Sequence, residues 1–174
     1  MLDAGAHEGD LVRVTGIVRP LDEMLVAPLS GRQCIAYRAR ASGATRIRGK
    51  QYSSGWQTTM QVRPFVVERD GGAGDIIVVG DHVMFGVHPE SLRPRNPDRE
   101  AAFMVRHAIQ AGRVRLVEVV VEVGAHVSVG GTLVLVPRDE PPTGERGFRD
   151  LPATDQQLAG NRETPLVIVA RDEP

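Results

Sequence analysis

The residues that could do chemistry begin with Cys34, the only cysteine among the 174 residues of the chain. A cysteine nucleophile needs a neighbouring histidine or a helix N-terminus to lower its pKa, and no motif around Cys34 supplies either. The residue instead opens an apolar segment after the polar residues 30–33, where a small thiol packs well. We therefore predict a buried, unreactive Cys34. A lone cysteine also excludes a disulfide within the chain and a cysteine-rich zinc site.

The five histidines do not predict a metal site. His82 and His126 follow similar glycine turns, so a barrel could bring these two side chains close together. His88 lies beyond an apolar strand, and His107 lies in the predicted helix. A zinc or other transition-metal site needs three or four ligands at turn or helical spacing, and no such spacing occurs. We expect no metal and interpret these histidines as residues at turn edges.

Lysine chemistry depends on one residue, because 20 of the 21 basic residues are arginines and only Lys50 is a lysine. Lys50 lies in a polar, glycine-punctuated stretch that predicts an exposed loop. Lipoyl and biotinyl carriers place their modified lysine at a hairpin tip, typically between methionines, whereas Gly49 and Gln51 flank Lys50. The chain also lacks a glycine-rich phosphate loop and a Gly-x-Ser-x-Gly elbow. We therefore expect no cofactor and no enzymatic activity.

One group of basic and aromatic residues forms a candidate binding patch: Arg38, Arg40, Arg46, Arg48, Tyr52 and Trp56. Aromatic rings in a basic groove are how OB-type proteins bind single-stranded nucleic acid. The chain has only one tryptophan, two tyrosines and four phenylalanines, however, and its 21 basic and 22 acidic residues leave a net charge of −1. Both facts favour a solvated hairpin, so OB-type binding of single-stranded nucleic acid is the alternative function and nucleic acid is not the expected partner.

The elements that must position these residues are mostly strands. Apolar and polar residues alternate over residues 12–19 until Gly16 interrupts, which predicts a bulge or a sharp barrel bend there. Further strands are expected at 35–41, 59–68, 76–79, 83–85, 116–123 and 127–136. Pro64 indicates an edge or a bulge in the strand that contains it. The last two strands are valine-rich, which predicts burial on both faces or strong curvature.

One segment, at about residues 97–111, predicts a helix. Asn96 can cap it, Pro97 suits its first position, and Gly112 can end it. Its expected apolar stripe is Ala101, Val105, Ala108 and Ile109. A helix of this length can close one end of a small barrel. Strands, one helix and more strands, with three similar glycine turns, predict a mostly β fold: an OB-like closed or partly open barrel with one α-helix and a C-terminal returning strand.

The predicted domain organisation has three parts. Residues 1–137 form the barrel domain, 138–165 a proline-, glycine- and charge-rich linker or surface loop, and 166–174 a C-terminal strand and tail. Residues 166–170 are five consecutive apolar residues, so we expect both faces of this strand to need cover. The strand is expected to dock at a barrel edge, either that of its own chain or that of a second copy. In the second case, residues 166–170 would join the copies of a homo-oligomer.

Residues 26–38 read Val-Ala-Pro-Leu-Ser-Gly-Arg-Gln-Cys-Ile-Ala-Tyr-Arg. This segment resembles the GIDE domain, also called the BAM (beside-a-membrane) domain, of mitochondrial outer-membrane E3 ubiquitin ligases and uncharacterised bacterial proteins. That family has a Pro-Leu-Ser-Gly turn followed by a cysteine and an aromatic-arginine strand. Trp56, residues 64–72 and residues 123–130 are similar to later parts of the domain, so the resemblance covers roughly residues 8–137. The family-motif residues that it singles out for binding or structure are Pro28, Leu29, Ser30, Gly31, Arg32, Cys34, Tyr37, Arg38, Trp56, Phe65 and Asp70.

The chain departs from this family in two ways. Family members usually carry transmembrane helices beside the domain, but no apolar run here approaches the roughly 18 residues of a membrane span. The ligases also carry a RING domain, whose two zinc ions need about eight cysteine and histidine ligands, more than this chain contains. Ubiquitin ligase activity is therefore not implied.

The resemblance implies a non-catalytic protein-interaction module whose partner is a protein, one candidate being a membrane protein. The N-terminal residues lack the basic and apolar regions of a secretory signal. We therefore expect a soluble, cytoplasmic protein that such a partner can recruit to a membrane.

Overall fold

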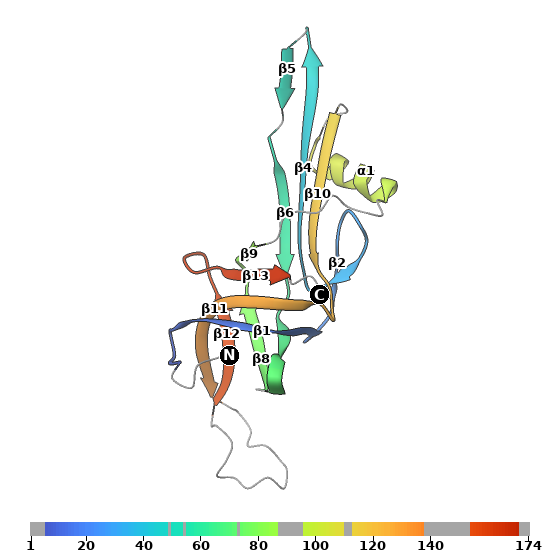
Figure 1. Ribbon diagram of the computed structural model, residues 1–174. Helices are drawn as coiled ribbons and strands as arrows, with labels where there is room; N and C mark the ends of the chain where they lie inside the picture. Colours follow the sequence, from blue (N-terminus) through green and yellow to red (C-terminus); the bar gives the residue numbers. More distant parts are fainter. Residues whose placement is uncertain are drawn as a thin grey trace.

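The computed structural model shows a β-barrel from which a second sheet extends as a long arm (Figure 1). It describes residues 6–48, 50–53, 55–72, 74–86, 96–109, 113–137 and 154–170. The strands are β1 (Leu11–Pro20), β2 (Leu25–Val26), β3 (Gln33–Cys34), β4 (Ala36–Ile47), β5 (Lys50–Ser53), β6 (Gln57–Val62), β7 (Phe65–Arg69), β8 (Asp75–Gly80), β9 (Val83–Phe85), β10 (Arg113–Val121), β11 (His126–Pro137), β12 (Thr154–Gly160) and β13 (Leu166–Ala170). The helical elements are α1 (Pro97–Arg106) and a short 3-10 turn, η1 (Asp70–Gly72).

Five strands close the barrel in the ring order β1, β7, β8, β12, β11 and back to β1. Strands β11, β1, β7 and β8 lie in Greek-key order, because the barrel strand that is fourth along the chain returns beside the first. Strand β12 pairs antiparallel with β11 and parallel with β8, which completes the ring. A five-stranded Greek-key barrel is the OB architecture, so the predicted OB-like barrel is confirmed.

Apolar side chains fill the barrel, each alternating along its strand with outward-facing residues. The interior consists mainly of Val14, Val18, Phe65, Val67, Ile76, Val78, Val127, Val129, Leu133, Leu158, Leu166 and Ile168.

Gly16 allows a close approach between β1 and β7. β1 pairs with β11 from Leu11 to Ile17 and with β7 from Gly16 to Pro20. A β-carbon at position 16 would lie 2.0 Å from the carbonyl oxygen of Glu68, so only glycine permits this close approach. Glycine is therefore needed where the alternation is interrupted, and the bulge or bend predicted there stays a prediction.

The linker predicted at 138–165 is wrong for residues 154–160, because these residues form β12 and complete the barrel. The barrel is therefore not contained within residues 1–137. The sequence of β12, Thr-Asp-Gln-Gln-Leu-Ala-Gly, lacks apolar alternation because Leu158 is its only large apolar residue that faces the core. Residues 138–153 lie outside the described part of the chain.

Strand β13 has the bounds predicted for the C-terminal strand. It pairs antiparallel with β11 and parallel with β9, so it docks on strands of its own chain. Leu166 and Ile168 are buried, whereas Val167 between them is 38% exposed. The expectation that both faces need cover is therefore wrong, because only one face of β13 points into the barrel.

The arm consists of β4, β5, β6 and the first half of β10. Strand β4 is central, with β10 on one edge and β6 and β5 on the other. Strands β4 to β6 are inserted between β1 and β7, the first two barrel strands. Pro64 lies between β6 and β7, so it separates an arm strand from a barrel strand and does not form a bulge within one strand.

Helix α1 packs on one face of the arm, so the expectation that it closes the barrel is wrong. Phe103 is buried in a second core cluster with Tyr37, Ala39, Ala41 and Leu116. The predicted stripe is also wrong in part, because Ala101, Val105 and Ala108 are exposed while Phe103 and Ile109 are buried. The bulkiest side chains decide which face of a helix is buried, since they remove the most apolar area from water.

The start of α1 is as predicted and its end is not. Oδ1 of Asn96 accepts the N–H of Arg99 at 3.2 Å, and Pro97 occupies the first turn. The helix ends at Arg106, well before residue 111, because Ala108 adopts a positive φ of 50°. Gly112, the predicted end, lies outside the described residues.

Candidate functional site

The Pro-Leu-Ser-Gly turn at residues 28–31 is built around a buried carboxylate. Glu118 on β10 is 2% exposed and accepts the backbone N–H of Leu29 at 2.7 Å and that of Ser30 at 3.1 Å. Gly31, with a positive φ of 77°, donates its N–H to the carbonyl of Ala27 at 2.9 Å. These family-motif residues fasten the turn to the base of the arm, which is a structural role.

The Pro-Leu-Ser-Gly turn begins at Pro28 and is followed by Arg32. Nη1 of Arg32 forms an ion pair of 2.6 Å with Oε1 of Glu122. Both side chains of this pair are nearly half exposed, so the ion pair contributes little to stability.

Cys34 and Tyr37 belong to the core beneath the turn. Cys34 is fully buried, with its Sγ 3.7 Å from the carbonyl oxygen of Leu25. Burial, followed by the negative charges of Glu118 and Glu122, raises the pKa of Cys34 to about 12. Its thiol is therefore protonated at neutral pH, and its predicted burial is confirmed.

Tyr37 is buried as well, and its hydroxyl donates to Oε1 of Gln61 at 2.9 Å. Burial raises the pKa of Tyr37 above its ordinary value. Phe65, another family-motif residue, is fully buried inside the barrel. The side chains of Cys34, Tyr37 and Phe65 are thus used in packing.

Three of the five histidines, His82, His107 and His126, have a different side-chain partner each. His126 Nε2 is 3.0 Å from the carboxylate of Asp70, the last family-motif residue, and His82 Nδ1 is 2.7 Å from Asp81. His107 Nε2 lies 3.0 Å from the hydroxyl of Thr59. His88 lies outside the described residues. In the described part of the chain, no three histidine, cysteine or acidic side chains gather in a way that could hold a metal ion.

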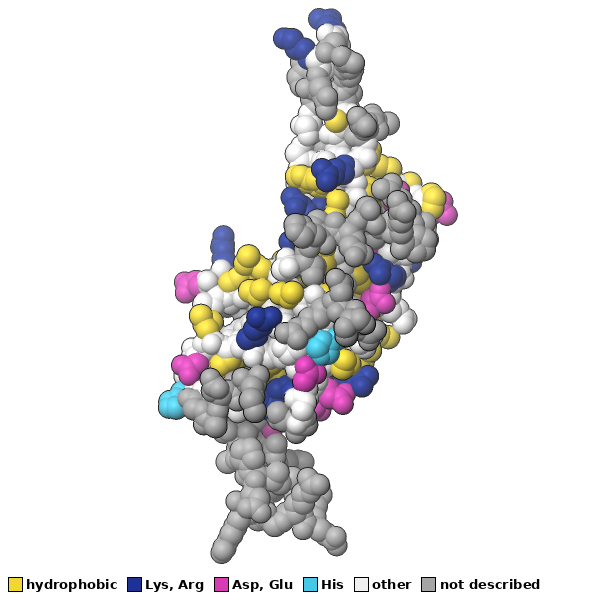
Figure 2. All heavy atoms as spheres, viewed as in Figure 1, with side chains coloured by type: hydrophobic (Ala, Val, Ile, Leu, Met, Phe, Trp, Pro, Cys, Tyr) yellow, Lys and Arg dark blue, Asp and Glu magenta, His cyan; other side chains and the backbone are white. Residues whose placement is uncertain are grey.

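Charge is segregated between the arm and the rest of the chain. Residues 36–62 and 113–117, which make up the arm, include seven basic residues and no aspartate or glutamate. The rest of the chain holds the other 14 basic residues and all 22 acidic ones, a net charge of −8. In Figure 2, dark-blue side chains continue to the tip of the arm, while the magenta ones lie on the barrel and beside α1. A net charge near zero therefore conceals a strongly cationic arm.

Three arginines share one face of the arm. Arg38 and Arg40 alternate along β4 with buried alanines that face α1, so both arginines lie on the opposite face. Arg115 on β10 pairs in register with Ser42, the next residue of β4 on that same face. Cations from two strands thus converge at the centre of the arm sheet.

Trp56, the only tryptophan of the chain, lies against two of these arginines, immediately before β6. The guanidinium carbon of Arg40 is 4.6 Å from the centre of the indole ring, and that of Arg115 is 5.7 Å from it. Both distances are in the range of cation–π contacts. We refer to Arg38, Arg40, Trp56 and Arg115 together as the arginine–tryptophan face.

The cations of this face have no acidic partner among the described residues. Nε of Arg38 is buried without a hydrogen-bond partner, and its guanidinium lies 5.5 Å from the centre of the Phe85 ring. Burial, and then the charge of Arg40, lowers the pKa of Arg38. Both effects disfavour the cation, so an anion bound beside these guanidinium groups would stabilise the charge of Arg38 and reduce its repulsion with Arg40.

The rest of the predicted patch lies farther along the arm. Arg46 in β4 pairs in register with Gln51 of β5, and the side chains of Arg46 and Tyr52 lie outside the described part. Arg48 is exposed at the turn between these strands, with a positive φ of 48°. Lys50, expected in a loop, is the exposed first residue of β5, because this stretch closes a hairpin onto β4.

The structure brings Arg38, Arg40 and Trp56 of the predicted patch together and adds Arg115. Sequence reasoning missed Arg115 and Glu118, because β10 meets β4 and the Pro-Leu-Ser-Gly turn only after folding. One available signal was overlooked: residues 24–67 contain no aspartate or glutamate. Such a long acid-free run predicts a local basic surface in a chain of balanced charge.

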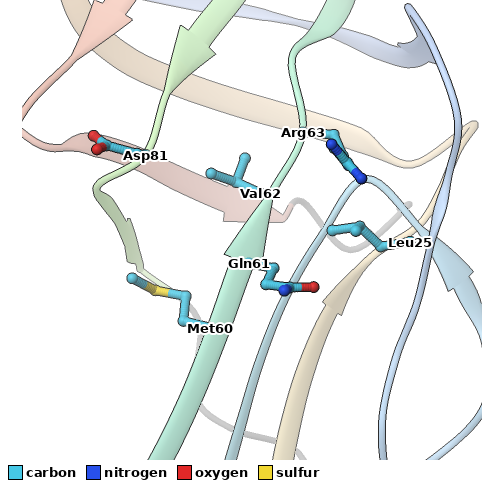
Figure 3. A pocket seen from close by; sticks show the side chains of 6 residues that line it. All are labelled: Leu25, Met60, Gln61, Val62, Arg63 and Asp81. Carbon is cyan, nitrogen blue, oxygen red and sulfur yellow. The ribbon is translucent and has the colours of Figure 1, made fainter.

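A hollow of about 320 Å³ lies beside the lower part of β6. Its lining residues are Leu25, Met60, Gln61, Val62, Arg63 and Asp81. Figure 3 shows Asp81 and Arg63 on opposite sides of Val62, so the two charged groups do not form a pair. The hollow therefore offers less for ligand recognition than the arginine–tryptophan face does.

Comparison with known proteins adds no assignment: no protein-family model, curated protein or solved structure matches the chain. Within the described residues, no helix has the length and apolar character needed to cross a membrane.

Proposed function

We propose that this chain is a non-catalytic, OB-type nucleic-acid-binding protein whose arm is the binding surface. The observation that carries the proposal is the charge of the arm, which has seven basic residues and no acidic one. Phosphate groups bind such a surface with release of their counterions, and this dominates the affinity of proteins for nucleic acid. The connection between the first two strands of an OB barrel is a known oligonucleotide-binding position, and most of the arm is inserted there.

The charge distribution favours the arm over the barrel wall. In OB proteins the second and third barrel strands also bind oligonucleotides, and these strands correspond to β7 and β8. Their outward side chains include Val66, Glu68, Ile77 and Val79, and Glu68 is paired with Arg19 at 2.9 Å. This wall offers few cations to phosphate groups, so the arm is the stronger candidate.

Fluorescence anisotropy with a labelled 20-nucleotide oligothymidine tests the proposal. We expect the full chain to bind at low salt and to lose affinity steeply as salt rises, with a slope of about −0.7 in log K against log salt for each phosphate contact. The triple variant Arg38→Gln, Arg40→Gln, Arg115→Gln removes three cations from one face. It should flatten this slope by roughly 2 and weaken binding at low salt on the order of 10- to 100-fold.

The matched control is Arg19→Gln, Arg32→Gln, Arg162→Gln, which changes the net charge equally at exposed positions outside the arm. It should bind nearly as well as the unmodified chain. Absence of binding at low salt, or an equal loss in the control, would refute the proposal. Binding to anionic lipid vesicles without binding to the oligonucleotide would assign the arm to a membrane surface instead.

A second candidate function, the non-catalytic protein-interaction module of GIDE/BAM type, is favoured by a different surface. Met84 on β9 and Val167 on β13 are cross-strand neighbours on the outside of the barrel, and both are exposed. Figure 2 shows hydrophobic side chains gathered over β13. Exposed apolar clusters of this kind mark sites of protein contact. Under this function, changing Met84 and Val167 to serine would abolish capture of a protein partner and leave any oligonucleotide binding intact.

A further inference from the structure

Trp56, the only tryptophan of the chain, is exposed to solvent and yet held in place. It belongs to neither core cluster, and 39% of its surface remains accessible. Its ring is nevertheless held, because the guanidinium groups of Arg40 and Arg115 lie 4.6 and 5.7 Å from its centre. The indole is thus fixed over the arm sheet by cations and not by burial.

The surroundings of this ring match what an unpaired nucleotide requires. A base stacks on an aromatic side chain whatever its identity, and its flanking phosphates need cations within a few ångströms. Arg40 and Arg115 lie within cation–π distance of the ring, and Arg38 lies two residues from Arg40 on the same face of β4, about 7 Å along the strand. Arg38 is only partly buried and has no acidic partner within the described part of the chain, so its guanidinium can take a phosphate oxygen as partner.

We propose that Trp56, held by Arg40 and Arg115, is a stacking site for one unpaired base, and that Arg38 binds a neighbouring phosphate. This inference rests on the proposed function and adds the class of nucleic acid. A duplex keeps its bases stacked inside, so it cannot offer a base face to Trp56. The arm therefore prefers single strands to a duplex of the same length.

The single tryptophan allows a direct test, because all tryptophan fluorescence of the full chain comes from Trp56. Titration with the 20-nucleotide oligothymidine should quench this fluorescence, and high salt should restore it as the complex dissociates. The same chain titrated with a 20-base-pair duplex should show little quenching. Trp56→Leu should weaken oligothymidine binding, measured by anisotropy, roughly 5- to 150-fold, while Trp56→Phe should stay within about threefold of the unmodified chain.

Each outcome decides between the two proposals. Binding that leaves the fluorescence unchanged, that is unaltered in Trp56→Leu, or that is equally tight for the duplex refutes the stacking site and leaves the proposed function standing. Absence of all oligonucleotide binding refutes both. If Trp56→Leu fails to fold, quenching in the unmodified chain and the affinity of Trp56→Phe still give the answer.

Discussion

Replacing Glu118 by glutamine should lower the free energy of unfolding by roughly 3 kcal/mol. The buried carboxylate accepts the backbone N–H groups of Leu29 and Ser30, each through a different oxygen. A glutamine has a single acceptor oxygen and would turn its amide N–H groups toward one of these donors, which leaves a buried N–H unsatisfied. Urea unfolding followed by circular dichroism measures the loss.

The control for this substitution is Glu122→Gln, four residues farther along the chain. Glu122 is nearly half exposed and pairs only with Arg32 in the described part, so its loss should stay below about 1 kcal/mol. Equal stability of Glu118→Gln and the unmodified chain would show that the Pro-Leu-Ser-Gly turn does not depend on this carboxylate.

Gly16→Ala should also destabilise the barrel, by about 3 kcal/mol or more, because two stretches of backbone meet at this residue. A β-carbon there would lie 2.0 Å from the carbonyl oxygen of Glu68 and 2.9 Å from the Cα of Arg69, and neither atom can rotate away. Gly130→Ala is the matched control, because its β-carbon would find its nearest neighbour at 3.8 Å, an ordinary contact. Thermal unfolding of the two variants side by side makes the comparison. Similar melting temperatures for both would contradict the role assigned to Gly16 in the close approach of β1 to β7.

Local patterns predict those parts of the fold that local chemistry controls. The start of α1 follows from Asn96 and Pro97, and the bounds of β13 follow from its apolar run. The division into barrel and arm does not follow from such patterns, because alternation looks the same in either sheet. Strand β12 was missed for a related reason: a strand that buries one large apolar residue has no detectable period.

The candidate site, too, could be predicted only in part from local sequence. Arg38, Arg40 and Trp56 lie close enough in sequence to be recognised as a basic and aromatic group. Their common face and the contribution of Arg115 depend on pairing between β4 and β10, which is a long-range contact. The global charge argued against nucleic acid, because it averages a basic arm with an acidic remainder. Charge counted for each part of the fold reverses that argument.

The most direct test of the central claim, that the arm is the nucleic-acid-binding surface, locates the contact on the chain. The full protein is mixed at low salt with an oligothymidine that contains 4-thiothymidine, irradiated and digested, and the cross-linked peptides are identified by mass spectrometry. We predict cross-links within residues 36–62 and 113–117, with Trp56 among the modified residues. Cross-links confined to the outward residues of β7 and β8, or to the surface around Met84 and Val167, would contradict the account.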